Sequence, residues 1–414
     1  MKKLICILIM VCAAPFCLQA QWYLFPGKNK PEEPRQPQTG TETVKPVEPA
    51  EEADTIRVSP STAEDTLEDL FEDLFVLDRP EEISVAVVLP LQADSDKPSV
   101  NFLDMYSGAL LAVRDLSSGG MKVRVKVIDS KSPEFQSMDS VIDDSDLIIG
   151  PVTYDEISAT LPLVTRSKRL ISPLEPKAAA LVDSSRLVQV PAPWQAQEDA
   201  LVDWLRRDSG SMDEVIVIKD PEASGIGEQA NYIISSLDNS GIKYRTVNSL
   251  SGISFEKTRG YRFIIASDRD AFIKSMARAV GYAGAQRDNV FLYATSKVRS
   301  LLDADAQDLY HANTRLTAGY YIDYNSEDVK DFVLAYRALF KKDPGQFAFQ
   351  GYDTMHYFLN ICNLYGRKWY KKLPEYSERG LQSDFKFLMR DGEGQINTAV
   401  KRVIYSHDLS ASVQ

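Results

Sequence analysis

The chain has few of the residues on which enzyme and metal chemistry most often depends. Its 414 residues include four cysteines and three histidines. Only Cys362 lies beyond the first 17 residues, in an apolar stretch where we expect it to be buried in a core. The histidines have no partners at zinc-ligand spacing, and no Gly-x-Ser-x-Gly elbow occurs. We therefore expect no catalytic residues, no metal, no cofactor and no enzyme activity.

Basic stretches are also missing. The formal net charge is -12, and residues 21–82 alone contain 16 acidic and 6 basic residues. The acidity is thus concentrated near the N-terminus, and the rest of the chain is close to neutral. Because nucleic-acid binding requires a basic surface, we expect no nucleic-acid partner.

Long apolar runs are absent except at the start of the chain. Lys2 and Lys3 precede an apolar run over 4–14 that is too short to span a bilayer. A small residue, Ala20, then offers a cleavage site, so 1–20 is predicted to be a signal peptide and the protein is predicted to be periplasmic. An uncleaved anchor is the alternative, although Pro15 interrupts the run.

A lipid anchor would require a small residue directly before the modified cysteine. Cys12 follows Val11 and Cys17 follows Phe16, and both preceding residues are bulky. A lipid anchor is therefore disfavoured. We expect membrane association only through a partner or through such an anchor.

Residues 21–82 are predicted to form an acidic, Pro-rich tether. The part over 26–60 has too few apolar residues to offset the entropy of ordering it. Apolar residues then recur at helical spacing between Leu67 and Leu77. This pattern predicts a short amphipathic helix that either docks a partner or caps the neighbouring domain, and the second role is favoured.

From Ile83 the pattern is that of an α/β protein. The run 83–89 is nearly continuous in apolar residues, as in a strand buried on both faces of a parallel sheet. Strands and helices then alternate, and the alternation restarts after 190. We predict two doubly wound parallel-sheet lobes joined by a hinge. The expected helices include 102–116, 154–167, 195–207, 226–238, 270–282, 326–341 and 348–365.

One glycine motif partly resembles a dinucleotide-binding fingerprint. Gly225, Gly227 and Ala230 match the fingerprint spacing between a strand and a helix. The true motif follows its strand at once, whereas 220–224 intervene here. A structural turn is the favoured interpretation.

Several segments in order resemble the type I periplasmic binding proteins, the family of the branched-chain amino-acid-binding components of ABC importers. The segments are 85–91, 108–113, 147–152, 170–174, 319–321, 332–336, 343–344 and 348–353. The resemblance covers roughly 83–414. It implies a first lobe from 83–190 and 318–392, a second from 191–317 and 393–414, and a solute bound between them.

The family's site maps onto residues that follow strands, but with departures. Thr153, Glu175, Ser224 and Ser296 stand at or near the family's ligand-binding positions. Gln92 also follows a strand, and Tyr321 is one of several tyrosines that could line the cleft, so all six are predicted to bind the ligand. Glu175 places a negative charge where relatives bind a carboxylate. The aromatic expected near Ser224 and the acid expected near Ser296 are missing. Thr153 also begins a capping-box sequence, and Tyr321 fits ordinary lobe packing equally well.

Two functions remain open. The first is capture of a small polar solute in the cleft between the lobes, with an ABC permease as a possible partner. The second is a cell-envelope protein-interaction module without a small ligand. That alternative resembles the lipoprotein activators of peptidoglycan synthases, and the acidic tether favours it. The usual role of the family favours the first.

Overall fold

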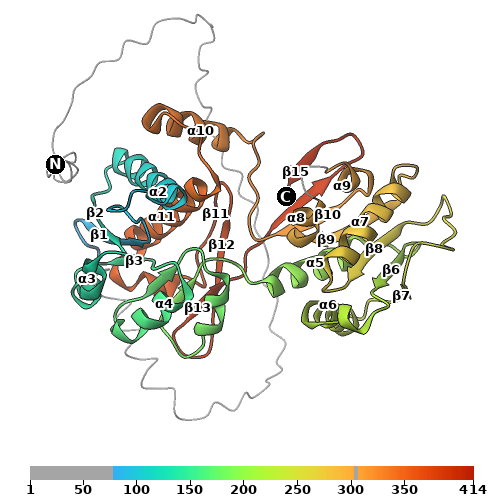
Figure 1. Cartoon of the computed structure of the whole chain (residues 1–414), viewed down its shortest axis with the longest axis horizontal. Coiled ribbons are helices and arrows are strands. Elements are labelled where there is room, and N and C mark those ends of the chain that lie inside the picture. The colour runs from blue at the N-terminus through green and yellow to red at the C-terminus, as the bar shows by residue number, and fades with distance from the viewer. Residues whose placement is uncertain (1–77, 303–305) are drawn as a thin grey trace, which may run out of the picture. The chain divides into compact units, whose positions relative to one another are not determined.

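The computed structural model describes residues 78–302 and 306–414, and these residues form two α/β lobes (Figure 1). The predicted signal peptide and amphipathic segment, and the tether up to residue 77, lie outside the described residues. In the described ranges, no helix combines the length and apolar character needed to cross a membrane.

The first lobe is built on an eight-stranded sheet with a parallel centre. Its strand order is β11-β12-β13-β5-β4-β3-β1-β2. All seven residues of β1 are buried, as the sequence predicts for a central parallel strand. The strands are β1 (Ile83–Leu89), β2 (Val123–Asp129), β3 (Leu147–Ile149), β4 (Leu170–Ser172), β5 (Leu187–Gln189), β11 (Ser377–Arg379), β12 (Asp384–Met389) and β13 (Gln395–Asn397).

Two long helices of the first lobe, α2 (Val100–Ser118) and α11 (Gln346–Tyr365), pack against each other. Glycines make this close approach possible. A Cβ atom on Gly108 would lie 1.9 Å from the carbonyl oxygen of Ala348, and one on Gly351 would lie 1.9 Å from that of Met105. Cys362, on α11, is fully buried as predicted, and burial raises its thiol pKa to about 12.

Shorter helices complete the first lobe. They are α3 (Met138–Asp143), α4 (Tyr154–Thr160) and α10 (Glu327–Phe340), with 3-10 turns η1 (Pro133–Ser137), η2 (Leu161–Leu163), η3 (Pro176–Leu181) and η5 (Gly366–Lys372). Helix α4 is shorter than the predicted 154–167. Pro162 cannot donate a helical hydrogen bond, and the chain continues as η2.

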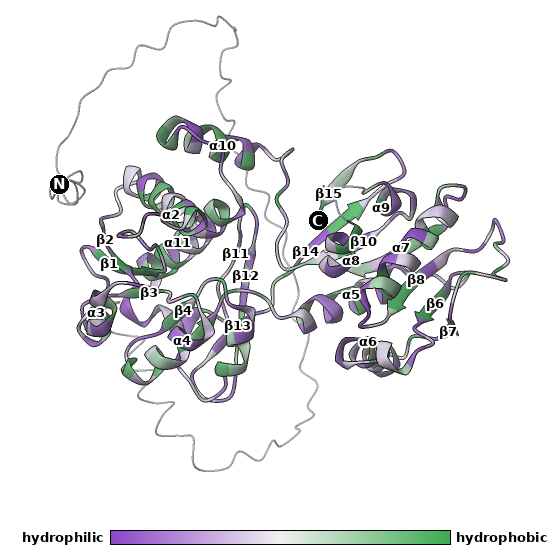
Figure 2. Cartoon of the chain, in the orientation of Figure 1, coloured by the Kyte–Doolittle hydropathy of each residue, from purple (hydrophilic) through white to green (hydrophobic). Residues whose placement is uncertain are grey.

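The second lobe has a seven-stranded sheet in the order β15-β14-β10-β9-β8-β6-β7. Its strands are β6 (Glu214–Lys219), β7 (Tyr244–Val247), β8 (Tyr261–Ala266), β9 (Val290–Thr295), β10 (Arg315–Ala318), β14 (Lys401–Tyr405) and β15 (Ala411–Val413). Its helices are α5 (Trp194–Asp208), α6 (Glu228–Asn239), α7 (Asp270–Gly284), α8 (Ser296–Leu302) and α9 (Gln307–His311), with the 3-10 turn η4 (Ala223–Gly225). Central strands such as β8 are strongly hydrophobic, whereas the helices are mixed (Figure 2).

The edges of both sheets differ from the prediction. Strands β12 and β14 run antiparallel to their neighbours β13 and β10, so neither sheet is wholly parallel. Strand β13 pairs with β5 in the first sheet, whereas we assigned 393–414 to the second lobe. The three-residue strands β11, β13 and β15 are too short for a periodic pattern to reveal.

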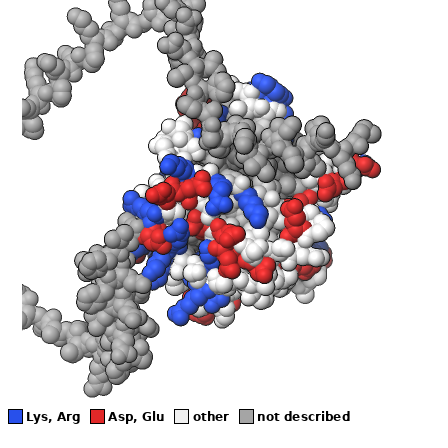
Figure 3. Space-filling model, turned by 90° about the vertical axis from the view of Figure 1, so that its left-hand side faces the viewer, with Lys and Arg blue, Asp and Glu red and all other residues white. Residues whose placement is uncertain are grey.

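Charges of both signs are interspersed on the face shown in Figure 3. This distribution agrees with the nearly balanced composition after residue 82. That face shows no broad cationic surface of the kind that a phosphate backbone requires.

Candidate ligand-binding site

In the first lobe, the predicted site residues follow the carboxyl ends of β1, β3 and β4. Gln92 is exposed and has a φ of 52°, in the left-handed region. The turn is held by Asp129, whose carboxylate accepts from the backbone N–H of Ala93 at 2.8 Å. These hydrogen bonds lower the pKa of Asp129 although its partial burial opposes the shift. The Gln92 side chain is therefore displayed on a fixed turn.

Thr153 caps the first turn of α4. Its hydroxyl accepts from the backbone N–H of Glu156 at 3.4 Å, so the first half of the predicted capping box forms. The second half differs from the prediction. The Glu156 carboxylate bonds instead to the Ser130 hydroxyl at 2.9 Å and to the Lys131 ammonium at 2.7 Å. Thr153 is partly exposed and can still donate its hydroxyl proton to a ligand.

Glu175 follows β4 and caps η3. One carboxylate oxygen accepts from the backbone N–H of Lys177 at 2.9 Å, and the backbone carbonyl accepts from the Gln189 side chain at 2.7 Å. The residue is half-buried. The Glu175 carboxylate is thus held near the strand ends by one of its oxygens, and its other oxygen takes no part in the cap.

The predicted site residues Ser224 and Ser296 lie in the second lobe, and so does Tyr321, although 318–392 is predicted to belong to the first lobe. Ser224 lies exposed in η4. Ser296 begins α8, and its hydroxyl donates to the side-chain oxygen of Gln197 at 2.7 Å. Tyr321 packs on the second core, with the guanidinium of Arg299 4.7 Å from its ring centre. Ser296 and Tyr321 therefore already have partners within the chain.

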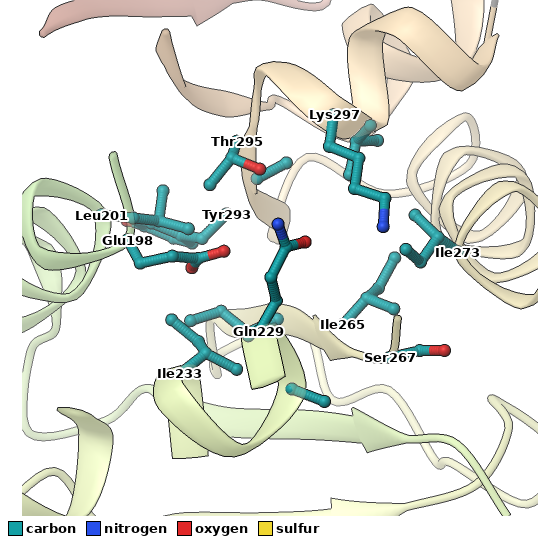
Figure 4. Close-up of a pocket in the computed structure, with 14 residues that line it drawn as sticks. Glu198, Leu201, Gln229, Ile233, Ile265, Ser267, Ile273, Tyr293, Thr295 and Lys297 are labelled. Atoms are coloured by element: carbon teal, nitrogen blue, oxygen red, sulfur yellow. The ribbon is translucent and has the colours of Figure 1, made fainter. Parts of the chain in front are cut away.

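A small cavity lies beside the carboxyl ends of β8 and β9 (Figure 4). Its volume is about 30 Å³, space for roughly two water molecules. Glu198 reaches it from α5, Gln229 from α6 and Lys297 from α8 (Figure 4). The cavity alone is too small for an amino acid or a sugar. The side chains that line it nevertheless bring polar groups to the carboxyl ends of the strands.

Glu198 is the acid that sequence analysis missed. Burial raises the pKa of its carboxyl to about 8, and the nearby carboxylate of Asp199 acts in the same direction. Lys297, which opposes that shift, pairs with Asp270 at 3.2 Å. The acid expected near Ser296 is absent, and this one comes instead from the second turn of α5. An acidic residue early in a helix that follows a strand was the signal in the sequence that could have revealed Glu198.

Asp268 occupies the N-terminus of α6. Its carboxylate accepts from the backbone N–H of Ala230 at 2.7 Å and from that of Gln229 at 3.2 Å. A Cβ atom on Gly227 would lie 2.4 Å from this carboxylate. The glycine motif therefore makes room for a side chain of the chain itself. This agrees with the predicted structural turn and leaves the α6 amides unavailable to a ligand's anion.

A second buried acid closes the end of β6. Asp220 forms a two-point ion pair with Arg269, at 2.7 and 2.8 Å, and accepts from the Ser267 hydroxyl at 2.7 Å. These bonds, with that of Arg269 foremost, hold the pKa of Asp220 well below its usual range. A Cβ atom on Gly225 would clash with this carboxylate. The segment after β6, where relatives place an aromatic residue, is thus held by hydrogen bonds and an ion pair within the chain.

No protein-family model matches the sequence. No curated protein matches it either. Similarity appears among solved structures. A putative branched-chain amino acid ABC transporter from Rhodospirillum rubrum is 12% identical, with a TM-score of 0.54, covering 80% of this chain and 100% of that one.

Two further structures are similar at lower scores. A substrate-binding protein from Desulfitobacterium hafniense in complex with Leu is 16% identical, covers 80% of this chain and 100% of that one, and has a TM-score of 0.44. The LpoA C-domain from Haemophilus influenzae, a regulator of PBP1A, is 12% identical, covers 80% of this chain and 99% of that one, and has a TM-score of 0.47. With the strand order above, the first similarity shows that the described chain has the fold of type I periplasmic binding proteins, as the sequence predicts.

Proposed function

We propose that this chain is an exported, non-catalytic binding protein that captures a cationic or hydroxyl-rich solute at the strand ends. The fold it shares with the Rhodospirillum rubrum protein supports a binding role, with an ABC permease as the partner that would receive the solute. The segment over 1–20 supports export to the periplasm.

The observation that carries the ligand class is the distribution of charge at the strand ends. Glu175 supplies a carboxylate and Glu198 a carboxyl group that burial keeps mostly protonated at pH 7, whereas Asp268 fills the α6 N-terminus, where an anion would otherwise bind. A bare carboxylate would meet repulsion from Glu175. A cation would be attracted by the Glu175 carboxylate, and a set of hydroxyl groups would find acceptors in Glu175 and in the carboxyl oxygen of Glu198 and a donor in Thr153.

A thermal-shift screen of the full exported chain tests this proposal. The solutes are polyamines, neutral sugars, peptides, peptidoglycan fragments and free amino acids. A ligand at about 100 times its Kd adds roughly 2.7 kcal/mol, which raises the Tm by about 5 °C in a chain of this size. We expect a polyamine or a sugar to give such a shift, and Glu175→Gln to reduce it. Glu134→Gln, an exposed acid on η1, is the matched control.

A second function is favoured by the internal bonds of the second lobe. The side chains of Asp268, Asp220 and Ser296 all form hydrogen bonds or ion pairs with partners within the chain. A cleft with so many satisfied groups suits an envelope protein-interaction module. If no solute shifts the Tm, and the wild-type chain captures a defined envelope synthase or transporter, this second function replaces the first.

A further inference from the structure

A groove lies at the amino-terminal edge of the first sheet, opposite the strand ends discussed above. Its volume is about 660 Å³, within the range of sites that hold small organic molecules. Arg169, directly before β4, and Glu393, shortly before β13, place it at that edge. Its walls combine charged groups, a hydroxyl group and two largely apolar side chains, from Arg166, Ser167, Arg169, Tyr370, Met389 and Glu393.

Arg169 is a buried cation whose hydrogen bonding is incomplete. The residue is 5% exposed, and its guanidinium lies 3.8 Å from the ring centre of Tyr370. Nη1 donates to the backbone carbonyls of Arg166 and Lys168. Within the part of the chain that the structure describes, Nε has no hydrogen-bond partner, and the nearest carboxylate oxygen to Nη2, from Glu393, is 3.7 Å away. This edge presents two N–H groups side by side, the arrangement that binds an oxyanion at two points.

Positive charge exceeds negative charge at the groove even when arginines alone are counted. Arg166 is exposed, and its guanidinium has no ion-pair partner among the described residues. The Glu393 carboxylate is bound by Arg186 at 2.8 Å. One carboxylate therefore stands against the guanidinium groups of Arg166, Arg169 and Arg186. Lys368 and Lys371 also line the groove but already interact within the chain, so this excess does not include them.

The remaining walls suit an organic group beside an anion. Ser167 is exposed, so its hydroxyl can donate to a further oxygen of a ligand. Met389 is 55% exposed and Tyr370 is partly buried, and together they offer an apolar surface with a thioether that suits an aromatic ring. A doubly charged anion with an apolar substituent thus matches both the charge and the lining. A zwitterionic amino acid does not, because the arginines would repel its ammonium group.

We propose that this groove binds an organic phosphate monoester. At pH 7 such an ester carries a charge of about −1.5 to −2 and three acceptor oxygens. Two of these oxygens accept from Nε and Nη2 of Arg169, and the third accepts from Arg166 or Ser167. The organic group of the ester lies against Met389 and Tyr370. Because the groove is at the edge of the sheet opposite the candidate solute site, its binding does not depend on a solute there.

Isothermal titration calorimetry of the full exported chain with phenyl phosphate tests the proposal. We expect one-to-one binding with a Kd below about 1 mM, and Arg166→Gln should weaken it at least about tenfold. Arg379→Gln, an exposed arginine on β11, is the matched control and should bind as the wild type does. Glu393→Gln removes the carboxylate from the groove and should tighten binding by about threefold or more. These surface variants keep the test valid even if the buried Arg169→Gln does not fold.

Two further probes test the ligand class. Benzoate keeps the ring but carries one negative charge, and inorganic phosphate keeps the charge but lacks the ring. Each should bind at least about fivefold more weakly than phenyl phosphate. The proposal is overturned if phenyl phosphate gives no saturable heat up to about 10 mM, or if Arg166→Gln and Arg379→Gln bind it equally well. Equal affinity for benzoate or for inorganic phosphate would also overturn it, because neither the second charge nor the organic group would then matter.

Discussion

The Asp268 carboxylate accepts a hydrogen bond from the backbone N–H of Ala230 at 2.7 Å, across a separation of 38 residues. A residue after β8 therefore caps the helix that follows β6. In a solute-binding site a helix N-terminus of this kind would attract the ligand's anionic group. Here the Asp268 carboxylate is that anion. It stabilises the second lobe, and its presence is one basis for the ligand class that we propose.

Removing this cap should destabilise the second lobe. Asp268→Ala leaves two N–H groups at the start of α6 without their acceptor, and we expect the free energy of unfolding to fall by about 2 kcal/mol. Urea denaturation followed by circular dichroism measures the loss. The exposed Asp288→Ala should change it by less than about 0.5 kcal/mol. Equal effects of the two substitutions would mean that the cap contributes little.

The contact between α2 and α11 should not tolerate a methyl group. A Cβ atom on Gly351 would lie 1.9 Å from the Met105 carbonyl oxygen, so Gly351→Ala should force the helices apart. We expect a loss of about 3 kcal/mol in the free energy of unfolding. Gly319→Ala is the control, because the nearest atom to a Cβ there is 3.7 Å away. An unfolding midpoint for Gly351→Ala equal to that of the wild type would contradict this close packing of α2 and α11.

Glu198 should make stability depend on pH. Its pKa is about 8 in the folded chain against 4.5 as the ordinary value, so between these values the folded state retains a proton that the unfolded state has lost. The free energy of unfolding should therefore fall as pH rises from about 5 to about 8. Glu198→Gln, which cannot ionise, should remove about 2 kcal/mol of that fall.

Urea midpoints at pH 5, 6.5 and 8 measure the Glu198 effect. The wild type and Glu198→Gln should differ most at pH 8, where the variant is the more stable protein. Glu134→Gln, an exposed glutamate of the first lobe, should follow the wild type at every pH. Parallel pH curves for the wild type and Glu198→Gln would show that this carboxyl titrates normally.

Thr153→Ala should cost about 1 kcal/mol of stability, because it removes the hydroxyl that accepts from Glu156 N–H at the start of α4. If Thr153 also binds the solute, a solute found in the screen should bind more weakly to this variant. Thr160→Ala is a useful comparison. The Thr160 hydroxyl is buried and donates to the Glu156 carbonyl at 2.7 Å, within the same helix but away from its start. Unchanged affinity in Thr153→Ala would remove Thr153 from the ligand site.

The sequence predicts the alternation of buried strands and helices well, because strands such as β1 are apolar on both faces. The sequence also predicts that Gly225 and Gly227 belong to a structural turn and not to a dinucleotide site. It does not reveal that Asp220 and Asp268 require those glycines, because such contacts join residues about 5 and 40 positions apart. Glu198 was missed because it lines the same cavity as Thr295 only in the folded lobe.

Isothermal titration calorimetry of the full exported chain with free leucine tests the central claim most directly. We propose that Glu175 repels a bare carboxylate and that Asp268 occupies the amides of α6 that would otherwise bind it. We therefore predict no saturable heat with leucine up to about 1 mM, where the binding free energy would be near −4 kcal/mol. One-to-one binding of leucine with a micromolar or tighter Kd would contradict it.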